Sequence, residues 1–113
     1  MKDLAPEIYR QRLVLEGYPN QAISDNEIKQ YLSELSSKID MHALITPVTH
    51  RSDKFGWAGW IHWETSGAHF YAWEEPRLFF SVDIYTCKSF VPQAAVQFTK
   101  DFFNIDTLEY REF

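Results

Sequence analysis

A chain of 113 residues with a net charge of −5 is long enough for one two-layer core but not for two, so we expect a single domain over residues 1–113. The acidic balance, without any basic cluster, argues against nucleic acid as a partner, and no apolar run approaches membrane-spanning length. The one cysteine excludes an internal disulfide and is typical of a cytoplasmic protein.

The first part of the chain predicts a strand, a helix and a second strand. The stretch "RLVLEG" is typical of a strand that stops at Gly17. Ser24 is expected to cap a helix, with Glu27 three residues later completing a capping box. Helical spacing places one apolar face on that helix: Ile28, Tyr31, Leu32, Leu35 and Ile39. Residues 42–50 resemble a second strand, in which Pro47 favours a sheet edge.

The later part predicts closely spaced strands followed by a helix and a last strand. After a loop at 51–59, strands are expected at 59–63, 68–73, 78–87 and finally 107–113. Pro92 suits the first turn of a helix whose apolar side would carry Val91, Ala95, Phe98 and Phe102. Short connections between strands predict an antiparallel sheet with both helices on one face, a two-layer α+β sandwich.

Alternation along residues 78–87 separates two faces of the expected sheet. One face carries Phe80, Val82 and Ile84, and the other carries Phe79, Ser81, Asp83, Tyr85 and Cys87. The first set suits a core under the helices. The second is mixed polar and aromatic, as a ligand-facing surface is, and His69, Tyr71 and Trp73 share one face of the neighbouring strand.

Aromatic residues are frequent for so short a chain, with four Trp, six Tyr and nine Phe. They predict a core and a subunit interface built from rings, or a ring-lined pocket for a flat ligand. The sequence holds no glycine-rich phosphate loop and no zinc motif, and its four scattered histidines predict no metal site. His42 and His50 are expected at the surface, and His62 in packing or an interface.

Three segments together resemble the short prokaryotic S-adenosylmethionine decarboxylases. "RLVLEGY" resembles the family's first strand, which carries a glutamate, here Glu16. "HRSDKFGWAGWIHWETS" resembles the segment that leads to the self-cleaving serine, and "SVDIYTC" the strand that ends in the catalytic cysteine. Trp73 and Glu75 match a "W-x-E" after the serine. The resemblance implies this fold, at least a homodimer, and decarboxylation of S-adenosylmethionine or a related amino acid in polyamine synthesis.

The resemblance also implies roles for single residues. Ser66 would attack the carbonyl of Thr65, the chain would be cut between them, and Ser66 would become a pyruvoyl group, the cofactor. The ketone of this group accepts the electrons released as CO2 leaves. Cys87 would then return a proton to carbon. Glu75 would hold the ribose hydroxyls, with Glu16 and Trp73 as further substrate-binding residues.

The chain departs from the family's pattern at several positions. The family's serine that assists self-processing falls on Ala58, and its processing histidine falls on Tyr71. The glutamate before the reactive serine falls on Thr65, and the histidine after it falls on Gly67. The phenylalanine that stacks on adenine falls on Ser52. Tyr71 thus remains a candidate catalytic residue by position. His69, on the same side of its strand, is expected to supply the missing imidazole, and Phe55 or Trp57 to stack on the purine.

These departures leave a second interpretation open. Ser66 is also an ordinary turn residue beside Gly67, and Cys87 an inert thiol. The chain would then be a homologue that has lost self-processing and binds an adenosyl ligand or a partner as a regulatory subunit. A third interpretation is lyase chemistry on the same ligand without a pyruvoyl group.

Overall fold

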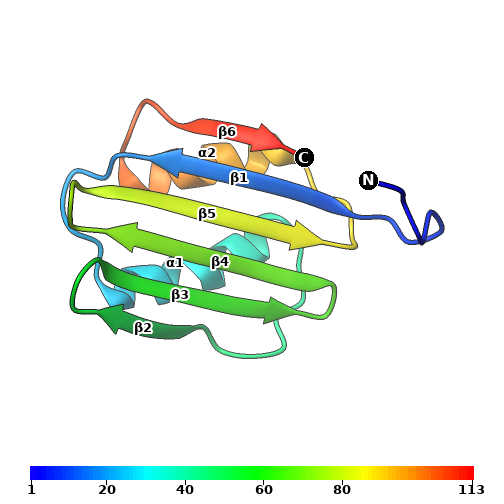
Figure 1. Cartoon of the computed structure of the whole chain (residues 1–113), viewed down its shortest axis with the longest axis horizontal. Helices are drawn as coiled ribbons and strands as arrows, with labels where there is room; N and C mark the ends of the chain where they lie inside the picture. Colours follow the sequence, from blue (N-terminus) through cyan, green and yellow to red (C-terminus); the bar gives the residue numbers. More distant parts are fainter.

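The computed structural model describes residues 1–113 as one six-stranded antiparallel sheet with two helices on one face (Figure 1). The strands are β1 (Gln11–Gly17), β2 (Val48–Ser52), β3 (Gly56–Trp63), β4 (Ser66–Trp73), β5 (Phe79–Thr86) and β6 (Glu109–Glu112), and the helices are α1 (Asp25–Lys38) and α2 (Pro92–Phe103). Their order across the sheet is β2-β3-β4-β5-β1-β6. The predicted α+β sandwich is confirmed.

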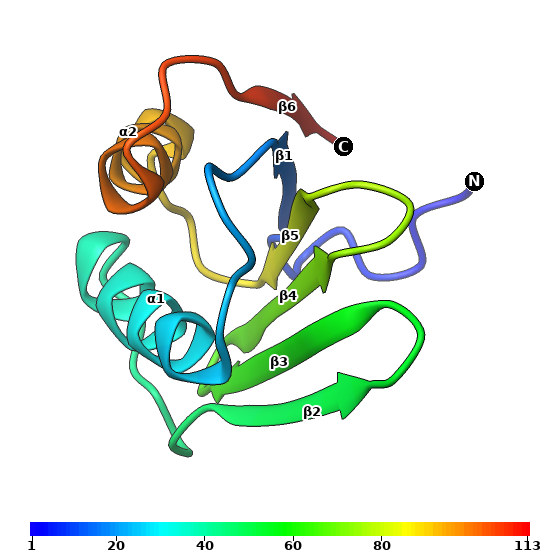
Figure 2. The same ribbon diagram turned by 90° about the vertical axis from the view of Figure 1, so that its left-hand side faces the viewer.

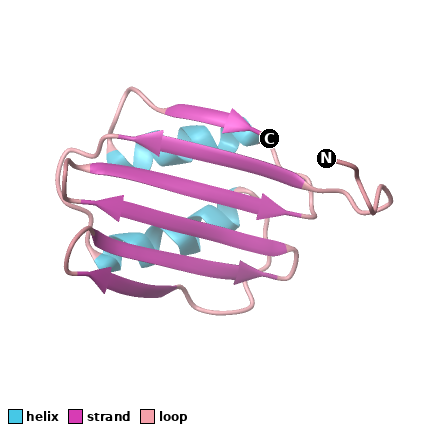
Figure 3. Ribbon diagram, viewed as in Figure 1, coloured by secondary structure: helices cyan, strands magenta, loops and turns pink.

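Both helices lie on the same side of the sheet, and the opposite face carries no helix or strand (Figure 2). Figure 3 shows the same division, with the two helices behind the strands. This uncovered side is called the open face below. Neither helix is long and apolar enough to cross a membrane.

The strand boundaries differ from the prediction in the middle of the chain. The strand expected at 42–50 begins only at Val48, because Pro47 cannot donate to a ladder. Ahead of it, only Ala43 forms an isolated bridge, with Trp63. The loop expected at 51–59 is shorter than predicted, since β2 continues to Ser52 and β3 starts just after the turn. The edge position of β2 agrees with what Pro47 indicated.

The helix signals in the sequence work as predicted at α1 and only in part at α2. Ser24 Oγ accepts a hydrogen bond from the amide of Glu27 at 3.2 Å, and Glu27 Oε1 accepts one from the amide of Ser24 at 3.1 Å, which completes the capping box. Pro92 occupies the start of α2. Val91, expected on its apolar face, instead precedes the helix as its N-cap and is 65% exposed.

The core lies between the helices and one face of the sheet. The predicted set Phe80, Val82 and Ile84 is fully buried there. Tyr31 is also fully buried, and its hydroxyl shares a 2.8 Å hydrogen bond with Thr99. Burial raises the pKa of Tyr31 well above its usual value, so this hydroxyl stays protonated. These rings serve packing, and the aromatic residues that remain for binding lie on the open face.

Candidate functional site

A band of rings crosses the open face. The rings of Trp60 and His69 have centroids 6.2 Å apart with 20° between planes, and His69 and Tyr71 are 5.8 Å apart with 13° between planes. Tyr71 is followed by Trp73 at 6.3 Å, and Trp73 by Phe79 at 5.2 Å. The shared face of His69, Tyr71 and Trp73 is therefore confirmed, and it carries rings from three neighbouring strands.

Ser66 stands at a tight corner between β3 and β4. Trp63 and Ser66 are paired across the ladder, so only Glu64 and Thr65 connect the two strands. Ser66 has a φ of 129°, a conformation that residues other than glycine rarely adopt. Such backbone strain persists where the surroundings enforce it and is frequent at reactive sites.

The peptide bond between Thr65 and Ser66 lies against the end of β5. The backbone amide of Cys87 donates a 2.9 Å hydrogen bond to the carbonyl oxygen of Thr65. Ser66 is paired with Thr86, whose hydroxyl donates to Thr65 Oγ1 at 3.1 Å. Thr65 Oγ1 in turn donates to Met41 Sδ at 3.4 Å, so this side chain turns inward. The fold therefore brings Thr65, Ser66 and Cys87 together.

A shallow hollow of about 410 Å³ on the open face joins Ser66 to the band of rings. The residues that line it are Trp60, Ile61, His62, Ser66, Gly67, Ala68, His69, Asp83 and Tyr85. His69 and Ser66 thus border one hollow, three residues apart on β4. Ser66, Thr65, Cys87, His69 and Asp83 are called the Ser66 cluster below. The thiol of Cys87 is free and exposed.

One ion pair lies beside this hollow. Arg12 donates from Nε to Asp83 Oδ1 at 3.0 Å and from Nη2 to Asp83 Oδ2 at 2.9 Å, a bidentate pair between β1 and β5. The hydrogen bond to Asp83 raises the pKa of Arg12 above its usual value, so the guanidinium stays charged. The sequence analysis did not single out Arg12 for the site.

The backbone at Gly67 explains one departure from the family's pattern. A Cβ atom at Gly67 would collide with the backbone carbonyl oxygen of Ile61 on β3. The corner is therefore closed so tightly that it has no room for a side chain at position 67, where the resemblance to the family predicts a histidine.

We expect Gly67→Ala to lower the free energy of unfolding by about 1–3 kcal/mol, because the backbone of β3 must move to admit the methyl group. Urea denaturation of the variant measures this change. Ser81→Ala, a change of similar size on the same face, is the control and is expected to leave stability within about 0.5 kcal/mol. Equal stability of the two variants would contradict the close approach at Gly67.

A second group of rings lies at the other end of the open face. Tyr18 and Phe79 have centroids 6.1 Å apart, Trp73 and Phe79 5.2 Å, and the guanidinium of Arg77 lies 5.9 Å from the ring of Tyr18. With Pro76 these residues line a hollow of about 350 Å³. Tyr18, Trp73, Arg77 and Phe79 are called the aromatic cluster. It is shaped for a flat group, since rings offer their faces to stacking.

The carboxylate of Glu75 is available near the aromatic cluster. Glu75 is exposed in the β4–β5 loop and forms no ion pair. Its neighbour Glu74 instead accepts a 2.9 Å bond from Arg51, which lowers the pKa of Glu74. Glu16 is also exposed and lies on β1, paired with Ser81 of β5.

The other two expected stacking rings do not line the hollow of the aromatic cluster, although the carbonyl oxygen of Phe55 accepts a 2.6 Å hydrogen bond from the amide of Glu74. Trp57 packs against the core, with Arg51 over its ring at 5.8 Å. Phe55 lies in the β2–β3 turn, 45% exposed, with Lys54 beside its ring. Neither residue is part of the aromatic cluster. The stacking surface of the open face includes Tyr18, which sequence reasoning missed and which the position next to Gly17 at the end of β1 would have indicated.

The Ser66 cluster and the aromatic cluster lie at opposite ends of β4. The β3–β4 turn is on the right of the sheet in Figure 1, and the β4–β5 loop is on the left. From Ser66 to Trp73 the strand advances seven residues, about 23 Å at roughly 3.3 Å per residue. A nucleoside joined to an amino-acid arm is shorter than this, so one such ligand does not reach from Ser66 to Trp73 of a single chain.

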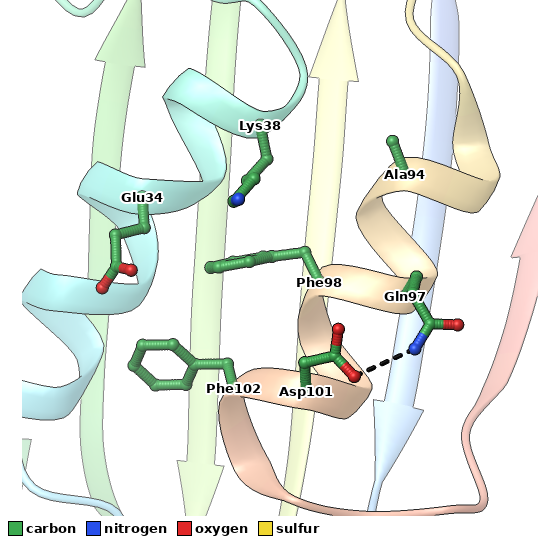
Figure 4. Close-up of a pocket in the computed structure, with 7 residues that line it drawn as sticks. All are labelled: Glu34, Lys38, Ala94, Gln97, Phe98, Asp101 and Phe102. Carbon is green, nitrogen blue, oxygen red and sulfur yellow. Dashed lines mark hydrogen bonds between the residues drawn. The ribbon is translucent and has the colours of Figure 1, made fainter.

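The largest hollow lies on the helix side and is separate from both clusters. It has a volume of about 490 Å³ between α1 and α2, with Phe98 and Phe102 facing Glu34 and Lys38 and a 2.9 Å hydrogen bond from Gln97 to Asp101 (Figure 4). It contains none of the residues expected in the site. No group of three or more His, Cys, Asp or Glu side chains is placed to hold a metal ion.

A model of the family described as S-adenosylmethionine decarboxylase matches residues 12–113. The chain belongs to the S-adenosylmethionine decarboxylase family. Its fold is similar to the solved structure of the adenosylmethionine decarboxylase from Aquifex aeolicus VF5, with a TM-score of 0.75 over 94% of this chain and 89% of that chain, at 14% sequence identity. No curated protein matches the sequence.

Membership of the decarboxylase family gives the departures at Ala58 and Tyr71 a structural meaning. These two residues are directly paired in the β3–β4 ladder. The two positions at which the sequence comparison predicts an assisting serine and a processing histidine are thus cross-strand neighbours. The pair lies along the strand from Ser66, so its replacement leaves the Thr65–Cys87 contact untouched.

Proposed function

We propose that the chain is a pyruvoyl-dependent decarboxylase of S-adenosylmethionine, or of a related amino acid, which activates itself by cleavage between Thr65 and Ser66. The observation that carries the proposal is the hydrogen bond from the Cys87 amide to the Thr65 carbonyl oxygen, next to a strained Ser66. One carbonyl is thereby both polarised and adjacent to a hydroxyl nucleophile.

Cleavage needs a nucleophile, a base and a donor for the oxyanion. The hydroxyl oxygen of Ser66 attacks the carbonyl carbon of Thr65, and His69, which lines the same hollow, takes the hydroxyl proton through water in that hollow. Negative charge then develops on the Thr65 oxygen, to which the Cys87 amide already donates at 2.9 Å. One such donor is worth about 3 kcal/mol in acyl transfer. The amide C–N bond breaks as its nitrogen gains a proton, which leaves an ester of Ser66.

Loss of the α-proton of Ser66 then breaks the ester bond and releases the carboxylate of Thr65. Hydrolysis at residue 66 releases its nitrogen as ammonia and leaves the pyruvoyl group. When formed, this group supplies a ketone that binds the substrate amine and takes up the electrons of the leaving CO2. Cys87, whose backbone bonds the Thr65 carbonyl and whose thiol is exposed, would return a proton to the substrate carbon. The exposed thiol is compatible with a reducing cytoplasm.

The substrate's nucleoside end fits the aromatic cluster. Its rings offer stacking faces for a purine, and the carboxylate of Glu75 is available for ribose hydroxyls. Arg77 already lies over Tyr18 and closes one side of this hollow.

We further propose that the active unit is a homodimer with facing open sheets. Ser66 and Trp73 are about 23 Å apart on one chain, too far for one ligand to span. An antiparallel copy across a two-fold axis would bring its aromatic cluster over the Ser66 cluster of the first chain. Such an interface would also cover exposed rings of the open face, including Tyr71 at 39% and Tyr85 at 46% exposure.

The mass of the purified protein under denaturing, reducing conditions tests self-cleavage. We expect two fragments, 1–65 and 66–113, the second with a blocked N-terminus, and a single intact chain for Ser66→Ala. CO2 release from labelled S-adenosylmethionine then tests turnover. An intact wild-type chain after long incubation would overturn the proposal.

That outcome would favour the second candidate, a homologue that binds an adenosyl ligand without cleavage. The loss of the paired processing residues at Ala58 and Tyr71, with the aromatic cluster present, is the observation in its favour. Binding of S-adenosylmethionine to the uncleaved chain, lost in Trp73→Ala, would then identify it.

A further inference from the structure

We propose that Asp83 is the positioning residue of His69: its carboxylate, held by Arg12, lies across the ladder from the imidazole without a hydrogen bond to it in this structure, and a small rotation of the ring would let it accept one and turn the other ring nitrogen toward the hollow at Ser66. This inference rests on the proposed function, in which His69 is the base of self-cleavage. It gives a role to an ion pair that the cleavage scheme does not use.

The sheet register sets Asp83 beside the imidazole. Asp83 and His69 are directly paired in the β4–β5 ladder, and both line the hollow that contains Ser66. Directly paired residues on one face of antiparallel strands have Cβ atoms about 4.5–5.5 Å apart, within reach of a hydrogen bond between these side chains. The two residues belong to adjacent strands of the sheet interior, so their relative position is fixed by the ladder.

The carboxylate has capacity for a second partner. Each oxygen of Asp83 accepts one hydrogen bond from Arg12, at 3.0 and 2.9 Å. A carboxylate offers about four lone-pair sites, so acceptor positions remain for an imidazole N–H. Arg12 holds the carboxylate in one plane, which a monodentate partner would not do.

Among the residues that line the hollow, Asp83 is the acidic neighbour of His69. Trp60 and Tyr71 lie near-parallel to the imidazole at 6.2 and 5.8 Å, which leaves the nitrogens on its edge to find partners elsewhere. The other polar side chains that line the hollow are Trp60 and His62 from β3, Ser66 from β4 and Tyr85 from β5. None of them is a carboxylate, so Asp83 is the group that selects one tautomer of His69.

The test compares Asp83→Asn with Arg12→Gln, because both variants break the same ion pair. Each is made in the Ser66→Ala background, and the tautomer of His69 is read from the ¹⁵N shifts of its two ring nitrogens. We expect Asp83→Asn to lose the single tautomer and Arg12→Gln to keep it. Asp101→Asn on the helix side, a carboxylate away from the open face, is the control and is expected to change nothing.

A tautomer of His69 that is the same in Asp83→Asn and in the parent would overturn the inference, whether or not the chain cleaves. In chains that keep Ser66, we expect cleavage to be at least about tenfold slower in Asp83→Asn than in the wild type. Asp83→Glu is expected to restore part of the cleavage rate. If the tautomer changes while cleavage does not, Asp83 positions His69 as inferred, and it is the role of His69 as the base in the proposed function that fails.

Discussion

Mixing two inactive variants, Ser66→Ala and Glu75→Ala, is expected to restore decarboxylation to about a quarter of the wild-type rate. In a mixed dimer, the Ser66 of one chain meets the Glu75 of its partner at one site, and the other site lacks both. Random mixing makes about half of the dimers mixed, each with one complete site of two. The geometric reason is the separation of about 23 Å along β4, which prevents one chain from supplying both residues to one ligand.

The control for this experiment pairs Ser66→Ala with Cys87→Ala. The amide of Cys87 bonds the carbonyl of Thr65, so Ser66 and Cys87 of the same chain serve the same site. No mixed dimer of these two variants contains a complete site, and we expect no restoration. The rates are measured as CO2 release after the two proteins are unfolded together and refolded. A rate equal to the mean of the two parents in the first mixture would mean that each site is formed by one chain.

Substitution of Cys87 is expected to separate self-cleavage from turnover. Cys87→Ala removes the thiol that returns the proton but keeps the backbone amide, so the chain should still cleave while CO2 release falls by about 10²–10⁴-fold. Cys87→Pro removes the amide instead and is expected to slow cleavage by about 10²–10³-fold. Cleavage is followed by the masses of the two fragments over time.

Slower cleavage of Cys87→Pro must also be distinguished from a folding defect. Circular dichroism and the urea midpoint of Cys87→Pro show whether the end of β5 is intact, since the substitution lies just after that strand. If Cys87→Ala fails to cleave although it folds, the thiol itself takes part in the acyl shift, and the amide is not sufficient.

Local sequence patterns predicted most of the helices and strands but few of the contacts in the candidate site. The capping box at Ser24 and the alternation through Phe80, Val82 and Ile84 predicted α1 and the core face of β5, because these patterns depend on residues a few positions apart. The strand expected at 42–50 failed in its first half because its apolar residues did not outweigh the missing amide of Pro47.

The assembly of the site depends on register, which a single sequence specifies only weakly. The contact of Cys87 with Thr65 follows from the pairing of Ser66 with Thr86 in the β4–β5 ladder. Tyr18 meets Phe79 because β1 returns to pair with β5, a strand far along the chain. Phe55 and Trp57 were stacking candidates by their nearness in sequence to Ser52; Trp57 packs against the core, whereas the carbonyl oxygen of Phe55 accepts a 2.6 Å hydrogen bond from the amide of Glu74, so its role stays a prediction.

The strand order has a further consequence for a molecule cut at residue 65. The first piece would contribute β1, β2 and β3, and the second β4, β5 and β6, yet β1 lies between β5 and β6 in the sheet. The two pieces are interleaved, so neither can leave without breaking ladders on both sides of β1. A nicked molecule would therefore stay whole in native buffer. Its refolding would become an encounter of two chains, and its melting temperature would rise with protein concentration.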